Sequence, residues 1–390
     1  MKKILLFLTF SSLSFADPIP GEMSLQTVSN APVRPITCNG DWVVSVAGLY
    51  WNPHQDGMEF AIDTSIFIPV LNPTPTELRE LNTLINAKYE TPSSNWEFGY
   101  KLGVGFNTTC DGWDIGIAWT RFHSCSFTHV EAEVSDNHSL IPLWSSFAPP
   151  QGETAFARDI EASWKLRLNL IDLELGRAFW VSKRLSLRPF IGLRYGSILQ
   201  DFDLEHMGGS WSPRVSPVQD PLNNEVSLDN DYQGFGVRSG LETLWHFECG
   251  WSLYGNLAPS ILYGRFNVDH NEQNRLAISP HSRIKILENK ACFRASRAIL
   301  DLALGIQWTG MFCNYKYAVT GRFGWDHHLF FHQNQMWRVM RIGDRSLPPL
   351  NNPPDEDFQA EINDAGENVF QQRRGTLDTQ GWTLTLIFEF

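Results

Sequence analysis

The stretch that decides the fold is the last nine residues, Trp382-Thr-Leu-Thr-Leu-Ile-Phe-Glu-Phe390. Every second residue is aromatic or leucine, and the residues between them are two threonines, an isoleucine and a glutamate. Successive side chains of a β-strand point to opposite faces, so this alternation predicts a strand with one continuous apolar face. Outer-membrane barrels typically end on such a strand, and Phe390 is therefore predicted to be the signal that the outer-membrane assembly machinery reads.

The same period-two pattern occurs in nine earlier segments. One of them slips phase near Leu170 and Ile171, and we interpret this slip as a β-bulge. We predict ten strands, at about 41–51, 96–106, 113–122, 161–176, 185–197, 232–245, 251–265, 296–308, 315–328 and 381–390.

The connections between these strands alternate strictly in length. Short ones lie at 107–112, 177–184, 246–250 and 309–314, whereas the long ones span 52–95, 123–160, 198–231, 266–295 and 329–380. Short periplasmic turns and long extracellular loops are typical of outer-membrane barrels. The sequence thus predicts an all-β fold, a transmembrane antiparallel up-and-down β-barrel in which residues 41–390 form one domain.

Two details of this barrel stay open. Segments 56–62 and 127–134 could add strands and bring the number to twelve or more. Residues 76–85 have the apolar spacing of a short helix, which could narrow the barrel mouth or lie on its surface.

The composition excludes other classes of protein. Mean hydropathy is -0.23 and no internal run of apolar residues is long enough for a membrane-spanning helix. The formal net charge of -12 argues against a nucleic-acid partner. Aromatic residues lie at the predicted strand ends, as expected of the girdles that border a lipid bilayer.

The N-terminus predicts export to the outer membrane of a bacterium. Lys2 and Lys3 precede an apolar run, and Ser14-Phe15-Ala16 forms a cleavage site, so residues 1–16 are predicted to be a signal peptide. Residues 17–40 are proline-rich and are predicted to be an extended periplasmic lead-in.

The face opposite the apolar one carries glycine, alanine and single charges, and we predict that it lines the lumen. Its charged groups could bias which ions pass through a channel, or they could pair as salt bridges that fill a closed interior. A pore for small hydrophilic solutes or ions and a closed structural or adhesive barrel, whose long loops bind envelope or host partners, both remain open. The predicted lumen-facing residues are Glu97, Lys101, Asp114, Arg188, Arg194, Arg238, Glu242, Asp301, Arg322 and Asp326.

Six cysteines in an exported chain favour disulfides. Cys38 and Cys110 could approach each other, and Cys249 and Cys313 lie in consecutive turns. The chain carries no phosphate-binding loop, no nucleophile elbow and no zinc-binding helix motif. We therefore predict no catalytic residue, cofactor or metal, and no enzymatic activity.

Several strings of this sequence also resemble a known family. They are Ser45-Val-Ala-Gly-Leu-Tyr-Trp51, Asp56-Gly-Met-Glu-Phe-Ala-Ile-Asp63, Leu173-Glu-Leu-Gly-Arg-Ala-Phe-Trp180, Leu187-Arg-Pro-Phe-Ile-Gly-Leu-Arg194, Arg297-Ala-Ile-Leu-Asp-Leu-Ala-Leu-Gly305 and Trp325-Asp-His-His-Leu-Phe-Phe-His-Gln-Asn-Gln335. Together they resemble the Legionella-type major outer membrane proteins, which have relatives in chlamydia-like bacteria. The resemblance implies an abundant pore-forming barrel, often with cysteines that bridge to envelope neighbours, and it supplies no catalytic residue.

Overall fold

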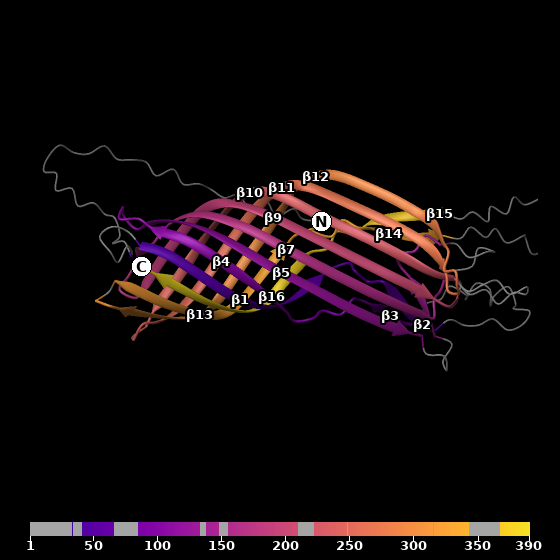
Figure 1. Ribbon diagram of the computed structural model, residues 1–390, viewed down its shortest axis with the longest axis horizontal. Coiled ribbons are helices and arrows are strands. Elements are labelled where there is room, and N and C mark those ends of the chain that lie inside the picture. Colours follow the sequence, from indigo (N-terminus) through magenta and orange to yellow (C-terminus); the bar gives the residue numbers. More distant parts are fainter. Residues whose placement is uncertain are drawn as a thin grey trace, which may run out of the picture. The chain divides into compact units, whose positions relative to one another are not determined.

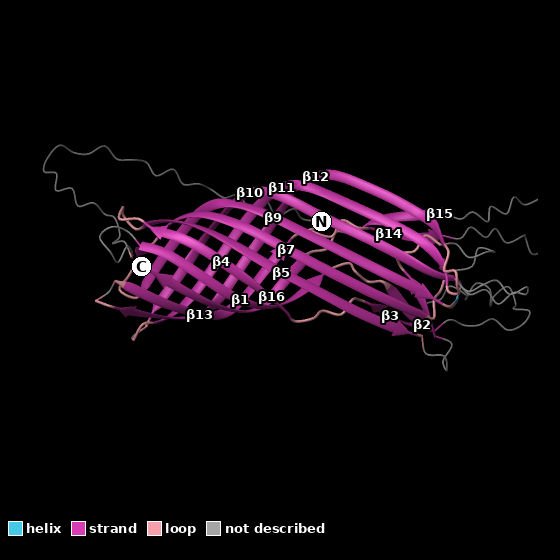
Figure 2. Ribbon diagram, in the orientation of Figure 1, coloured by secondary structure: helices cyan, strands magenta, loops and turns pink. Residues whose placement is uncertain are grey.

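The computed structural model describes Val33 and residues 41–65, 85–132, 138–147, 155–209, 222–247, 249–314, 316–342 and 367–390. The regular elements in these residues are all β-strands (Figure 2). The described part of the chain holds no helix able to cross a membrane. The predicted signal peptide lies outside the described residues, as do the lead-in apart from Val33 and the predicted helix apart from its last residue, Ile85.

Ten antiparallel strands form a closed barrel, and each of them corresponds to one of the ten predicted strands (Figure 1). Each strand pairs with the next, and the last pairs with the first. In order they are β1 (Asp41–Gln55), β4 (Glu97–Asn107), β5 (Trp113–Glu131), β7 (Asp159–Arg177), β9 (Leu185–Met207), β10 (Leu222–His246), β11 (Trp251–Leu276), β12 (Arg283–Phe312), β13 (Tyr317–Phe330) and β16 (Leu377–Glu389). The predicted all-β barrel is confirmed.

The first and last strands close the ring over thirteen register positions, from Val43 opposite Glu389 to Gln55 opposite Leu377. Beyond them, the Trp42 amide donates to the Phe390 carbonyl at 2.8 Å, and the Phe390 amide donates back at 2.9 Å. An unpaired backbone group in hydrocarbon costs several kcal/mol, so this closure is what allows the sheet to lie in lipid.

The remaining strands are not part of the barrel wall. β2 (Ala61–Ser65), β3 (Ile85–Glu90) and β6 (His138–Pro142) form one small sheet, and β14 (Trp337–Ile342) pairs with β15 (Glu367–Gln372). A two-residue strand, β8 (Phe179–Trp180), pairs with β9. Segment 56–62 therefore adds no barrel strand, and 127–131 only lengthens β5.

Several barrel strands are far longer than predicted. β9, β10, β11 and β12 have 23, 25, 26 and 30 residues, against 11 in β4. Much of the predicted loops 123–160 and 198–231 is strand, and 266–295 is strand apart from the turn at 277–282. We call residues 123–131, 159–169, 197–207, 222–233, 265–276 and 283–297 the extended wall; it lies at the end opposite the short turns.

The two faces of the barrel exchange character at the start of the extended wall. Near the short turns, large apolar side chains such as Leu257 and Leu304 point outward and are 49% and 61% exposed. In the extended wall, Leu168 and Phe202 point inward and are fully buried, while Lys165 and Asp201 point outward. An apolar outer face requires lipid and a polar one requires water, so the exchange marks the edge of the membrane.

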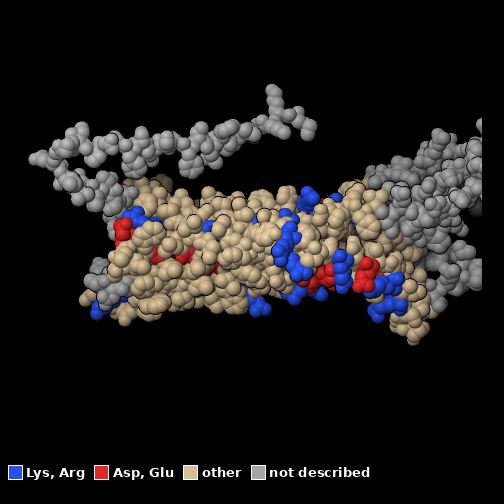
Figure 3. Space-filling model, turned by 90° about the horizontal axis from the view of Figure 1, so that it is seen from above, with Lys and Arg blue, Asp and Glu red and all other residues tan. Residues whose placement is uncertain are grey.

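The exchange also explains the phase slip in β7. Leu170 is buried and the next residue, Ile171, is exposed, yet the pairing of β7 with β5 and β9 continues without a register shift. The predicted bulge was wrong, because two regular patterns of opposite sense meet there. Figure 3 shows the result on one face: few charges interrupt the left-hand part, and charged side chains gather toward the right.

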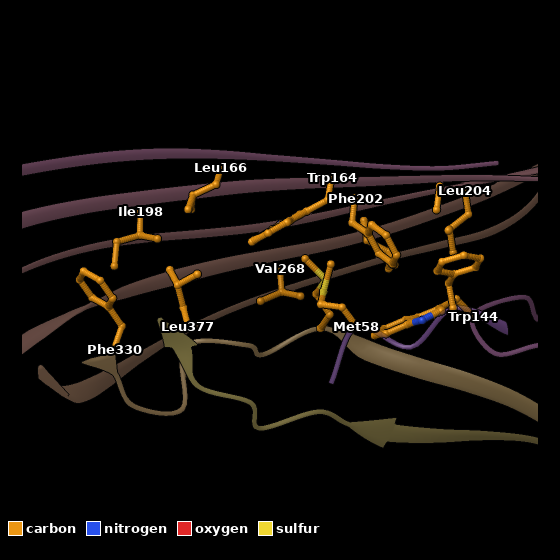
Figure 4. Packing of buried hydrophobic residues seen from close by; sticks show 14 of the residues in the cluster. Met58, Trp144, Trp164, Leu166, Ile198, Phe202, Leu204, Val268, Phe330 and Leu377 are labelled. Atoms are coloured by element: carbon orange, nitrogen blue, oxygen red, sulfur yellow. The ribbon is translucent and has the colours of Figure 1, made fainter. Parts of the chain in front are cut away.

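The interior of the extended wall contains an apolar core. Wall residues including Leu166, Ile198 and Phe202 belong to the same buried cluster as Met58 and Trp144, which are not part of the barrel strands (Figure 4). The rings of Trp144 and Phe202 pack edge-on with their centres 6.0 Å apart. We call residues 56–61 and 138–147 the plug segments. Their apolar side chains Met58, Phe60, Leu140, Leu143 and Trp144 are at most 2% exposed, so this part of the interior is dry.

Candidate functional site

The membrane-spanning half of the interior contains a layer of buried ion pairs. Arg194 of β9 contacts Asp172 of β7 at 2.6 Å and Asp301 of β12 at 2.7 Å. Because β9 and β12 are not neighbours in the sheet, the contact between Arg194 and Asp301 crosses the barrel interior. All three side chains are at most 3% exposed.

Further contacts extend the layer around the barrel. Arg188 of β9 contacts Asp114 of β5 at 2.5 Å, and Arg322 of β13 contacts Glu242 of β10 at 2.7 Å. Arg238 contacts Asp301 at 3.1 Å and also binds Glu174, and His328 Nδ1 lies 2.8 Å from Asp301 Oδ1. We call Asp114, Asp172, Glu174, Arg188, Arg194, Arg238, Glu242, Asp301, Arg322 and His328 the charged layer.

Seven of the ten residues predicted to face the lumen meet in this layer. The other three lie elsewhere: Lys101 lines a cavity, Asp326 accepts a hydrogen bond from Thr383 at 2.6 Å, and Glu97 makes no ion pair among the described residues. The sequence prediction missed Asp172 and Glu174, because they lie just after the phase slip that we interpreted as a bulge. His328 was not among the predicted lumen-facing residues either.

A cavity of about 510 Å³ lies between the charged layer and the short turns. All ten barrel strands contribute to its lining, which places it inside the barrel. Its lining is more apolar than polar, but it includes the charged residues Lys101, Arg188 and Glu242. The ring nitrogens of His246 form hydrogen bonds with the hydroxyl groups of Ser186 at 2.9 Å and Ser252 at 3.1 Å. The His246 ring also packs against Trp180, with ring centres 4.7 Å apart.

At the opposite end, one buried carboxylate holds a plug segment against the wall. Glu272 of β11 accepts hydrogen bonds from the Ser145 hydroxyl at 2.6 Å, the Ser146 amide at 2.8 Å and Asn224 at 2.8 Å. Asn224 also contacts His206 Nδ1 at 2.9 Å, and burial lowers the pKa of His206. The contact therefore rests on a carboxylate with neutral donors, which is how a buried charge is tolerated without a cation.

The five described cysteines are exposed free thiols: Cys110, Cys125, Cys249, Cys292 and Cys313. The structure thus contains no bridge between Cys249 and Cys313. Their turns are separated by two strand spacings of about 4.8 Å each, beyond the roughly 7 Å between Cα atoms that a disulfide allows. Cys38 lies outside the described residues, so its pairing with Cys110, like bridges to envelope neighbours, stays a prediction.

A family model that matches most of the chain shows which family the protein belongs to. The model described as "Legionella pneumophila major outer membrane protein precursor" matches residues 35–367. The chain belongs to this family of outer-membrane proteins. The predicted resemblance is confirmed, and the barrel lies in a bacterial outer membrane, with the short turns on the periplasmic side and the extended wall outside the cell.

Three solved structures are similar to this chain at very low sequence identity and low TM-scores. The outer membrane protease OmpT from Escherichia coli is 10% identical, with a TM-score of 0.38 and coverage of 94% of this chain and 99% of that one. A TodX mutant described as a monoaromatic hydrocarbon channel is 9% identical, with a TM-score of 0.27 and 91% coverage of each chain. A FadL homologue from Pseudomonas aeruginosa is 6% identical, with a TM-score of 0.24 and 90% coverage of each. The comparison with curated proteins gives no match.

Phe390 lies at the end of β16, where its ring stacks on Phe388 at 5.4 Å between ring centres. If the assembly machinery reads this residue, Phe390→Ser will lower the amount of barrel inserted in the outer membrane. The same variant, refolded from urea into detergent, will show wild-type heat-modifiability, because its backbone pairing with Trp42 does not need the ring. Equal insertion of the variant and wild type in cells would contradict this role.

Proposed function

We propose that this protein is a gated pore for small hydrophilic solutes and ions, and that the described structure corresponds to its closed state. The observation that carries the proposal is the cavity of about 510 Å³ at the periplasmic end, whose lining includes the charged side chains Lys101, Arg188 and Glu242. A closed structural barrel needs no hollow space with charged side chains in its lining within the membrane. Side chains can move aside without breaking the barrel wall, whose backbone hydrogen bonds remain intact.

Two barriers then control passage. The charged layer is the constriction, and mixed guanidinium and carboxylate groups there bias which ions cross it. The plug segments form the gate, since they fill the interior without belonging to the barrel wall, and segment 138–147 is held at Glu272 by hydrogen bonds from Ser145 and Ser146.

Single-channel recordings in planar bilayers test this proposal. Wild-type protein is expected to give stepwise current increases. Arg194→Ser combined with Asp172→Ser removes two side chains from the constriction and leaves Asp301 paired with Arg238 and His328, so each step should become larger. The matched control removes an ion pair outside the lumen, Arg177→Ser with Asp111→Ser, and should leave the step size unchanged.

A second candidate is a closed surface barrel whose extracellular parts bind partners. The dry core of the extended wall favours it, because wall residues such as Leu168, Phe202 and Leu228 would face water if the plug segments left. Absence of current steps from folded, heat-modifiable wild-type protein and from the double variant would support this function and reject the pore.

A further inference from the structure

We propose that Arg265 and Arg294, on the outer face of the barrel, bind a phosphate group of a glycolipid in the outer leaflet. The two residues lie directly opposite each other on the antiparallel strands β11 and β12. Both side chains are exposed and point away from the charged layer, so this site is separate from the lumen and independent of the proposed pore.

The two arginines have no protein counter-charge among the described residues. Neither guanidinium makes an ion pair within the described residues; Arg265 Nε instead contacts Asn267 Oδ1 at 3.1 Å and Cys292 Sγ at 2.8 Å. Like charges directly opposite each other destabilise a β-sheet. Elsewhere on this wall, Lys290 lies 3.8 Å from Asp269 on the facing strand, so the unpaired arginine couple stands out.

The two arginines also lie at the edge of the lipid-facing surface. On the outward face, the next register pair toward the membrane is Tyr263 and Ser296, and the following one is Ile261 and Ala298. Tyr263 and Ile261 are each 58% exposed on the lipid-facing surface. The arginines are thus the first charged residues beyond the apolar surface of these two strands, at the level of lipid headgroups.

The chemistry of the arginine pair favours a phosphate group. Two guanidinium groups present planar sets of donors that match phosphate oxygens in a bidentate manner. A free phosphate would use only the arginines. A phosphorylated glycolipid would also place its acyl chains along Ile261, Ala298 and the apolar residues that follow, which is why we commit to the lipid.

The test measures binding of bisphosphorylated lipid A to the folded, full-length barrel in detergent by native mass spectrometry. An arginine near an anionic lipid surface contributes about fivefold in affinity. Arg265→Gln combined with Arg294→Gln should therefore weaken binding by roughly twenty-five-fold, and Arg265→Lys with Arg294→Lys should fall between this variant and wild type. The matched control is Arg167→Gln, since Arg167 also lies just beyond the apolar surface of its strand but is paired with Asp201 at 3.1 Å.

Each result of this binding experiment either supports or overturns the proposal. Retained heat-modifiability shows that the variants fold, and the lysine variant provides a second test should the glutamine variant fail to do so. The proposal is overturned if the glutamine variant binds lipid A like wild type, if the Arg167 control loses as much, or if dephosphorylated glycolipid binds equally well. Displacement of lipid A by millimolar inorganic phosphate would also overturn it, by showing a free-phosphate site. Current recordings of the same variants should match wild type, so a failed pore proposal leaves this one unaffected.

Discussion

Arg194→Leu is expected to destabilise the barrel by about 3–5 kcal/mol, because it leaves the buried carboxylate of Asp172 without its cation. Arg194 is 2% exposed and contacts Asp172 and Asp301, which are each 3% exposed. The substitution keeps much of the side-chain volume, so the loss comes from electrostatics rather than from a cavity. Arg238 and His328 still contact Asp301, but Asp172 loses its only ion-pair partner among the described residues.

The measurement is urea unfolding in detergent or lipid vesicles, followed by heat-modifiability on gels. The matched control is Arg177→Leu, which breaks the ion pair with Asp111 in a periplasmic turn. Asp111 is 52% exposed, so this change should cost about 1 kcal/mol or less. Equal losses from the two variants would show that the charged layer is solvated, and the constriction that we assign to it would be rejected.

Leu257→Lys is expected to destabilise the barrel by about 2–4 kcal/mol, although the side chain is half-exposed. In a water-soluble protein, a change at such an exposed position usually stays within about 0.5 kcal/mol. The difference arises because Leu257 lies midway between Trp251 and Tyr263 on the outward face of β11, where lysine would enter hydrocarbon.

The control for this prediction is Asn271→Lys, on the same outward face of the same strand. Asn271 belongs to the extended wall and lies opposite Glu288, so lysine there faces water and a carboxylate. It should change the free energy of unfolding by less than about 0.5 kcal/mol. If both variants unfold at the same urea concentration, the membrane does not end where the two faces exchange character.

The lipid-embedded part of the fold follows from local patterns, and the sequence was sufficient to predict it. Strands such as 96–106 and 381–390 alternate cleanly because one face meets lipid and the other meets polar groups. Strand length beyond the membrane could not be predicted in this way. In residues 222–231 and 266–276, the outward face is polar and the inward face mixes leucine, valine and phenylalanine with asparagine and histidine. Such segments look like loops when the expected apolar face is the outward one.

The candidate site was partly predictable for a related reason. Alternation identified Arg194, Arg238 and Asp301 as facing the interior, but no local pattern says which of them meet. Their contacts join strands that are separated by one or two others in the barrel, and these depend on its diameter and stagger. Asp172 was not predicted because β7 carries two apolar–polar alternations of opposite sense, which meet at Leu170 and Ile171.

The exchange of faces within one strand has a consequence for assembly. Sliding β7 by one residue against its neighbours would turn Leu166, Leu168 and Leu170 toward water and Asp172 toward hydrocarbon at the same time. A shifted register of a long strand is thus unfavourable both in water and in lipid. A short strand such as β4 is held in register by its contact with lipid alone. The long strands therefore favour a single register, and they can set the register that the short strands then adopt.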